Sequence, residues 1–290
     1  MRNERLMMLT AWAAIATAGT LVVIKALAWY ASGSVAMLGS LTDSAMDVAA
    51  SIINFLAIRY ALMPADAEHR FGHGKAEALA GLGQGALITI SALFLLSESV
   101  QRVRNPLAIE ASALALGVTL VSLLLTILLV LLQRHTVRRT GSAAIAADQL
   151  HYLSDVLVNI GVLLALLGAL LLGWLWLDGA VGLLVGLYIL RSALQIGWQS
   201  AQLLLDRELA DDIRLRIAAQ LMKHPQARGW HDLRTRASGQ TWFVQCHVEM
   251  RNDLSLEEAH QVIVEMMQLV QQVYPQAQVM LHPDPVPAAE

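Results

Sequence analysis

Six stretches of the sequence are apolar over the length that is needed to cross a lipid bilayer. A helix needs about 20 predominantly apolar residues to span roughly 30 Å of hydrocarbon. The stretches that meet this requirement are 9–30, 35–61, 76–96, 111–132, 143–172 and 179–205. The composition agrees, because 56% of the 290 residues are hydrophobic and only 15% are charged. We therefore predict a polytopic α-helical domain with six transmembrane helices over residues 1–205, whose first span is not a cleaved signal peptide.

The connections between the spans differ in their content of lysine and arginine. The N-terminus and the second and fourth connections together carry eight such residues, whereas the other connections carry only Arg102 and Arg104. Basic residues are enriched in cytoplasmic loops. The bias predicts a multi-pass protein of the inner or plasma membrane with both termini in the cytoplasm. The net charge of −3 gives no sign of nucleic-acid binding.

Two aspartates lie four residues apart in the second span, in the stretch LTDSAMD. In a helix, Asp43 and Asp47 share one face with Ser51 and Asn54. An acid near the centre of a membrane helix costs about 2.5 to 3.5 kcal/mol of insertion free energy. The apolar neighbours can offset this cost, so the segment can still insert.

The fifth span carries a matching face in the stretch ADQLHYLSDVLVN. Here Asp148, His151, Asp155 and Asn159 recur at steps of three, four and four. The two spans are antiparallel in a six-span topology, and both polar pairs fall near mid-membrane. Three carboxylates and one imidazole suit Zn²⁺ in tetrahedral geometry. We predict a four-coordinate divalent-metal site made of these residues: Asp43, Asp47, His151 and Asp155.

Two other interpretations fit the same residues. The polar groups could pair with one another to lock helices together, as polar side chains do in membranes. They could also form a proton relay without a metal ion. Two acid or imidazole pairs on different spans weaken the first interpretation, but His151 fits a relay as well as a metal site.

A histidine-rich connection follows the second span, with the sequence MPADAEHRFGHGKAE. In it Asp66, His69 and His73 are spaced by three and four residues, and Glu68 is an alternative oxygen donor. Pro64 ends the preceding helix, and two glycines disfavour a helix through the histidine pair. One carboxylate and two imidazoles are a common set of metal ligands. We predict a loop metal site, with solvated loop histidines as the alternative.

Glycine patterns in the spans predict helix packing and not catalysis. Gly81 with Gly85, and Gly182 with Gly186, form G-x-x-x-G motifs that favour close approach of helices. The stretch GLGQG has neither the preceding strand nor the spacing of a dinucleotide-binding loop. The zinc-protease motif H-E-x-x-H does not occur in the sequence. We predict that the protein is not an enzyme.

The sequence after Asp206 is more polar and changes its periodicity. Helices are predicted over 211–223 and 256–273, the second with Ser255 and Glu258 as a capping box. Strands are predicted over 230–237, 241–250 and 277–281. The order αββαβ predicts a small α+β domain over residues 206–290, in which helices cover one antiparallel sheet.

Five of the nine histidines lie in this domain, which suggests a cytoplasmic metal site. The predicted ligands are His231, His247, His260, His282 and Asp284. His224 is the weakest candidate, and packing is the alternative for each histidine. Cys246 and His247 are neighbours in a predicted strand, so their side chains should face opposite ways. We expect the single cysteine in the core, without a disulfide, as in a reducing compartment.

These motifs together resemble those of the cation diffusion facilitator family, and closely those of its zinc- and iron-exporting subgroup. The likeness covers essentially the whole chain through LTDSAMD, SIINFLAIRY, PADAEHRFGHGKAE, ADQLHYLSD, LLDRELAD, HDLRTRASG and HPDP. The resemblance implies that the intramembrane metal site is the transport site and that the loop also binds metal. It further implies a two-ion site in a C-terminal domain of ferredoxin-like fold. It also implies a homodimer with a charge interlock between Lys75 and Asp206. One departure is Val286, where some relatives have cysteine.

The predicted function is export of a divalent metal ion from the cytoplasm in exchange for protons. Metal binding requires neutral His151 and ionised aspartates, so metal and protons compete for the same groups. The reference pKa of histidine, about 6.5, makes His151 the predicted coupling group. Alternating access would follow from rocking of helices around the site. Zn²⁺ is the predicted substrate and regulator, with Cd²⁺ and Fe²⁺ as alternatives. A passive cation channel is the rival interpretation.

Overall fold

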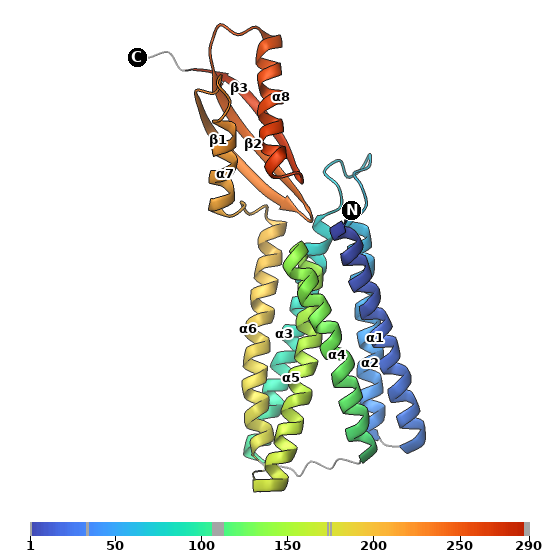
Figure 1. The fold of residues 1–290 in the computed structure, drawn as a ribbon. Coiled ribbons are helices and arrows are strands. Elements are labelled where there is room, and N and C mark those ends of the chain that lie inside the picture. The colour runs from blue at the N-terminus through green and yellow to red at the C-terminus, as the bar shows by residue number, and fades with distance from the viewer. Residues whose placement is uncertain (1, 33–34, 106–112, 173, 175, 287–290) are drawn as a thin grey trace. The chain divides into compact units, whose positions relative to one another are not determined.

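The computed structural model describes residues 2–32, 35–105, 113–172, 174 and 176–286, and these residues form two compact units (Figure 1). The helical unit comprises Met1–Pro64 and Ala76–Ala201. The mixed unit comprises Ala65–Lys75 and Gln202–Glu290. The histidine-rich connection therefore belongs with the C-terminal part of the chain. The predicted start of the fourth span at residue 111 lies outside the described residues.

Six long helices dominate the helical unit. Their bounds are α1 Arg2–Ser32, α2 Val35–Ala61, α3 Lys75–Arg104, α4 Ala113–Thr140, α5 Ala143–Leu172 and α6 Leu177–Leu204. At 1.5 Å per residue a 30-residue helix is about 45 Å long, which exceeds the hydrocarbon thickness. Among the described residues, five of these helices qualify as membrane spans by length and composition, and α5 matches them with 30 residues. The protein is a polytopic helical membrane protein.

The surface of the helical unit is apolar, as a surface in contact with lipid must be. Leu27, Phe94 and Leu171 are examples of large apolar side chains that are more than 60% exposed. The interior is also apolar but contains small residues, including Ala11, which is buried between helices. Hydrophobic burial does not distinguish the two sides of such a helix, so close packing and polar contacts specify the bundle.

The glycine motifs lie where helices approach closely, as predicted. A Cβ atom at Gly85 would lie 3.2 Å from the backbone of Gly197, so α3 and α6 are in near backbone contact there. A Cβ atom at Gly179 would lie 2.5 Å from the backbone nitrogen of Val103, at the other end of the same helix pair. Glycine is required at these positions because any side chain would force α3 and α6 apart.

The mixed unit contains a three-stranded sheet and two helices. Its elements are α7 Asp211–Leu221, β1 Gly229–Ser238, β2 Thr241–Met250, α8 Leu256–Val273 and β3 Ala277–Pro285. The αββαβ order is confirmed, and α8 begins at the predicted capping box of Ser255 and Glu258. Both helices pack on one face of the sheet, where Ile217, Val244 and Met266 form part of one buried core.

The prediction of a wholly antiparallel sheet is wrong. The strand order is β1-β2-β3, with β1 antiparallel to β2 but β2 parallel to β3. The reason is that α8 returns the chain across the sheet between β2 and β3, so that β3 starts at the same end as β2. β3 also continues to Pro285, four residues beyond its predicted end. The extension places His282 and Asp284 in a regular strand and not in a loop.

Candidate metal sites

The first cluster lies between α2 and α5, inside the helical unit. Asp47, His151 and Asp155 each offer a ligand atom, and these atoms all lie within 4.8 Å of one another. The Nε2 atom of His151 lies 3.0 Å from Oδ1 of Asp47. The four-residue step from His151 to Asp155 places both on the face of α5 that meets α2. Asp43 lies one turn away on α2, exposed and outside this group.

Hydrogen bonds hold the two helices in register beside this cluster. The hydroxyl groups of Ser51 and Tyr152 lie 2.7 Å apart, and both residues are at most 2% exposed. Asn159 donates its side-chain N–H to the carbonyl oxygen of Asp155 at 2.7 Å. The buried contact between Ser51 and Tyr152 limits sliding of α2 along α5. The spacing between the Asp47 and His151 side chains is thereby fixed by the backbone of two helices.

Lys25 of α1 is a charged neighbour that the sequence patterns did not single out. Its ammonium group donates hydrogen bonds to Oγ of Ser44 at 2.7 Å and to the carbonyl oxygen of Ser40 at 3.2 Å. It also lies within electrostatic reach of Asp43, Asp47 and Asp155. One lysine inside an otherwise apolar span was the available signal, since intramembrane charges are costly and usually paired.

The second cluster lies in the loop between α2 and α3, within the mixed unit. Asp66, His69 and His73 offer ligand atoms within 4.8 Å of one another, as the sequence predicted. His73 Nε2 lies 3.3 Å from Asp66 Oδ2, and His69 Nδ1 lies 3.5 Å from Oδ1. Backbone N–H groups of His69 and Glu68 donate to Asp66 and hold the pKa of its carboxyl below the usual value. The carboxylate is therefore ionised and oriented for a cation.

The loop is seated on the sheet by aromatic and ionic contacts. Phe71 packs edge-on against Phe243, with ring centroids 5.5 Å apart. The guanidinium group of Arg236 lies over both rings, at 5.0 and 4.6 Å. Lys75 Nζ lies 3.0 Å from Asp206 Oδ1, and Arg236 approaches the same oxygen at 3.2 Å. Partial burial raises the pKa of Asp206, but Lys75 and Arg236 outweigh it and hold the pKa below its usual value.

The third cluster follows from the register of the sheet. His231 of β1 is the partner of His247 on β2, and His247 is the partner of His282 on β3. Paired residues face the same side of a sheet, so the three imidazoles form a row across it. A bulge between His231 and Arg234 shifts the pairing just beyond this row. The row lies on the face opposite the helices, because Cys246, the neighbour of His247, is buried in the core.

The carboxylate of Asp284 contacts all three imidazoles. Its carboxylate oxygens lie 2.8 Å from His247 Nδ1, 3.2 Å from His231 Nε2 and 3.3 Å from His282 Nε2. The hydrogen bond from His247 is the main cause that holds the pKa of Asp284 below its usual value. Glu249 also reaches His231 Nδ1 at 3.4 Å, and sequence patterns missed it although it is paired with Asp284 across the strands.

Two other histidines of this domain lie apart from the row: His260, a predicted ligand, and His224, the weakest candidate. His260 is exposed on α8, the helix that covers the other face of the sheet. His224 contacts Glu265 at 3.1 Å, which agrees with its rank as the weakest candidate. Burial raises the pKa of the Cys246 thiol to about 11, so the thiol is neutral and a poor metal ligand at physiological pH.

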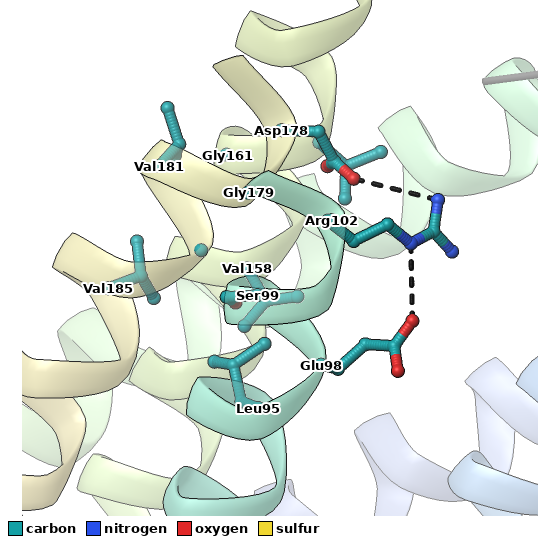
Figure 2. Close-up of a pocket in the computed structure, with 12 residues that line it drawn as sticks. Leu95, Glu98, Ser99, Arg102, Val158, Gly161, Asp178, Gly179, Val181 and Val185 are labelled. Atoms are coloured by element: carbon teal, nitrogen blue, oxygen red, sulfur yellow. Dashed lines mark hydrogen bonds and ion pairs between the residues drawn. The ribbon is translucent and has the colours of Figure 1, made fainter. Parts of the chain in front are cut away.

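A cavity of about 120 Å³ between α3, α5 and α6 has a different character (Figure 2). Arg102 lies between two carboxylates there, 3.2 Å from Glu98 and 3.8 Å from Asp178. Figure 2 shows the guanidinium group bridging the end of α3 and the start of α6. The other lining residues are mostly apolar or glycine. Both carboxylates are thus paired with the guanidinium group, in contrast to the carboxylates of the three clusters, which face imidazoles.

The donor sets indicate which ions the three clusters could hold. Each combines carboxylate oxygen with imidazole nitrogen, and none of the three groups includes a cysteine. Nitrogen and oxygen donors suit Zn²⁺ and other borderline divalent ions, whereas Cu⁺ prefers thiolate and thioether ligands. The cluster of Asp47, His151 and Asp155 differs from the other two because its residues lie within membrane-spanning helices. Only there would binding and release place an ion inside the bilayer.

Two family models match consecutive parts of the chain, and known proteins match it over nearly its whole length. Residues 11–205 match the cation efflux transmembrane domain, and residues 209–286 match the cytoplasmic domain of cation efflux proteins. The cation-efflux pump FieF of Shewanella oneidensis is 48% identical over 274 residues, covering 94% of this chain and 92% of its own. The FieF pump of Klebsiella pneumoniae is 46% identical over 289 residues, covering 99% of this chain and 96% of its own.

Among solved structures, the zinc form of a putative zinc transporter, CzrB, is 31% identical. It aligns with a TM-score of 0.28 over 29% of this chain and 98% of its own. The two matched domains account for nearly the whole sequence, and the relatives match over nearly their full length. The chain therefore belongs to the cation efflux (cation diffusion facilitator) family, whose members are membrane transporters and not enzymes.

Proposed function

We propose that the protein exports Zn²⁺ from the cytoplasm across the inner or plasma membrane in exchange for protons. The observation that carries this proposal is the half-buried cluster of Asp47, His151 and Asp155 between two membrane-spanning helices. All three groups bind either a metal ion or a proton. Asp43 completes the proposed transport site, because it lies one turn from Asp47 and interacts electrostatically with Lys25 and Asp155.

Competition at these residues supplies the coupling between zinc and protons. Zinc binding needs a neutral imidazole nitrogen and ionised carboxylates, so an arriving ion displaces protons. When the site opens to the other side, protons bind the same atoms and release the ion. Lys25 supports this exchange, because its positive charge partly offsets the carboxylates in the metal-free site. Rocking of helices around a fixed site would supply alternating access.

The orientation of the chain follows from its charges. The bias of arginine and lysine toward the N-terminus and the even-numbered connections supports a cytoplasmic position of both termini and of the mixed unit. Zinc would then reach the cluster from the end of the helical unit where α5 begins. We assign residues 1–205 to transport and residues 206–290 to metal binding and dimerisation, with the loop of Asp66 docked on the latter.

Zinc is the preferred substrate on the chemistry of its ligands. One imidazole favours Zn²⁺ and Cd²⁺ over an all-oxygen site, and Fe²⁺ is the third candidate. Replacing His151 with aspartate should broaden transport toward harder ions such as Mn²⁺. Unchanged selectivity in His151→Asp, measured by flux of competing ions, would count against the assigned ligand set.

The loop and sheet clusters are proposed as regulatory zinc sites in a homodimer. Zinc at the sheet cluster would bind Asp284 and the histidine row and reduce electrostatic repulsion on that face of the sheet. α8 covers the opposite face, so His260 could reach a sheet-bound ion only from a second copy of the chain. The assignment of His260 as a ligand of this site therefore requires a homodimer. His260→Ala should therefore lower zinc binding in the dimer without changing the histidine row of one copy.

Flux measurements on the purified chain in liposomes test the antiport proposal. With a proton gradient imposed, liposomes should accumulate zinc against its own gradient, and collapse of the proton gradient should stop accumulation. A passive cation channel would instead carry zinc only down its gradient. Zinc flux that does not respond to the proton gradient would sink the proposal.

A further inference from the structure

A second buried polar group surrounds Asp148, apart from the three metal clusters. Asp148 on α5 is 2% exposed, and three carboxamide side chains from three other helices converge on it. Gln133 of α4 donates to Oδ2 at 2.7 Å, and Gln84 of α3 donates to Oδ1 at 3.4 Å. Asn54 of α2 supplies a further hydrogen bond. We call these four residues the carboxamide cage.

The cage leaves three oxygen atoms without partners. The side-chain oxygens of Asn54, Gln84 and Gln133 are buried and accept no hydrogen bond from the residues that the structure describes. Asn54 is 2% exposed and Gln133 is fully buried. A buried oxygen without a donor is costly, and the cost is greater at low dielectric. A guest that is positively charged or donates hydrogen bonds would satisfy these oxygen atoms.

The cage lies between the cluster of Asp47, His151 and Asp155 and the end of the helices where α5 begins. Asp148 precedes His151 by three residues, so the two lie about 4.5 Å apart along the axis of α5. They also interact electrostatically. Nearer the end of the unit, Ser142 donates to the buried carboxylate of Glu77 at the start of α3. Two buried acids, Glu77 and Asp148, therefore lie between this end of the bundle and His151.

The chemistry of the cage differs from that of the transport cluster. Its donors are one carboxylate and three amide oxygens, all of them hard and none of them a nitrogen ligand. Such a set holds a divalent cation that keeps part of its water shell, but more weakly than imidazole holds Zn²⁺. An ion that passes from the cage to His151 thus moves from a weaker to a stronger set of ligands.

We propose that the carboxamide cage is an entry site, in which Asp148 captures the divalent cation from the cytoplasm and delivers it to His151 and Asp155. This proposal rests on the proposed function, since export requires entry from the end where α5 begins. Asp148 acts here as a transient ligand during entry, distinct from the residues that hold the ion for transport. The three amides orient its carboxylate and replace water molecules of the ion.

The variant Asp148→Asn separates this role from a structural one. Asparagine has nearly the same shape, and its oxygen still accepts the hydrogen bond from Gln133. Its amide nitrogen would face the Gln84 nitrogen, and a half-turn of the Gln84 carboxamide converts this contact into a hydrogen bond to the Gln84 oxygen, so a purely structural cage should tolerate the change well. An entry site should not tolerate it, because the charge that attracts the cation is lost. The double variant Asp148→Asn/Gln133→Glu restores one carboxylate inside the same cage.

The measurement is zinc uptake into inverted membrane vesicles that contain the full-length chain, followed with a zinc-sensitive dye. For Asp148→Asn we expect the KM for zinc to rise about tenfold or more, with little change in kcat, because the loss falls on capture. The double variant should recover part of the lost kcat/KM. Ser122→Ala removes another buried polar group of α4, outside the cage, and should behave as wild type.

Two results would overturn the entry site. One is an Asp148→Asn protein that folds and transports with wild-type KM, and the other is a double variant that fails to recover any capture although it folds. Failure of the proposed antiport gives a different pattern, in which zinc uptake by the wild type ignores the proton gradient while the KM of Asp148→Asn still rises. The two failures are therefore distinguishable in the same vesicles.

Discussion

Gly74 offers a sharp test of how the metal-binding loop is held, because it touches the turn between β1 and β2. A Cβ atom at position 74 would lie 2.5 Å from the carbonyl carbon of Ser238 and 2.8 Å from the nitrogen of Gly239. Ordinary Cβ contacts lie at 3.4 Å or more, so the two backbones must separate by about 0.9 Å. The neighbouring atoms belong to the backbone and cannot rotate away.

The variant Gly74→Ala should therefore destabilise the docked loop by about 1 to 3 kcal/mol, the usual cost of overpacking. Gly74 lies between His73 and Lys75, so displacement should also weaken zinc binding by the loop cluster and the ion pair with Asp206. Hydrogen exchange followed by mass spectrometry measures the effect. Amides of residues 65–75 should exchange about 5 to 150 times faster, because each 1.4 kcal/mol of opening free energy is a factor of ten.

Gly83→Ala is the matched control, since a Cβ atom at Gly83 would meet nothing within 4 Å. Within α3, alanine should be neutral or stabilising by about 1 kcal/mol. If Gly74→Ala leaves both loop exchange and zinc binding unchanged, the loop is not held by this contact and the argument from close packing is refuted.

Three further predictions concern chemistry in the mixed unit and at its surface. Cys246 is 2% exposed with a pKa of about 11, so at pH 8 only about one thiol in a thousand is ionised. Iodoacetamide should therefore label this thiol only when the chain unfolds. Rapid labelling of the folded chain would contradict its burial. Zinc should leave the sheet cluster on acidification while Asp284, with its lowered pKa, is still ionised, because protons compete with the metal for the imidazole nitrogens. Release that begins only where Asp284 itself is protonated, seen by equilibrium dialysis, would implicate the carboxylate instead. The pKa of Asp206 is lowered, so its contacts with Lys75 and Arg236 stabilise the fold above the unfolded pKa near 4, and this stabilisation is lost as pH falls through the lower folded value. Asp206→Asn should lose this stabilisation, which is on the order of 1 kcal/mol or less for such exposed groups. An unfolding curve that does not respond to the substitution would count against the prediction.

Local periodicity allowed the sequence to predict much of the fold and most of the clustered residues. The step of four in α5 is sufficient to place His151 and Asp155 on one face, and the apolar stretches define the six long helices. The loop cluster was also predictable, because its residues are close in sequence and glycines prevent a helix there. These features depend on neighbours along the chain and need no knowledge of tertiary packing.

Features that depend on distant segments were not predictable in the same way. The direction of β3 depends on how α8 returns across the sheet, which strand patterns do not encode. The carboxamide cage joins four helices, and a single glutamine such as Gln133 in a span carries no sign of its partners. Glu249 joins the sheet cluster only through strand register. Lys25 was visible as a charge in an apolar span, but its nearness to Asp47 required the packing of α1 on α2.

The central claim is that zinc and protons alternate at the cluster of Asp47, His151 and Asp155 between α2 and α5. Proton release on zinc binding tests it most directly, measured with a pH-sensitive dye in weakly buffered solution for the purified wild type beside Asp47→Ala. The wild type should release more protons per chain than the variant, because only the intact cluster exchanges its protons for the metal. Equal proton release from the two proteins, at equal occupancy of the loop and sheet clusters, would contradict the account.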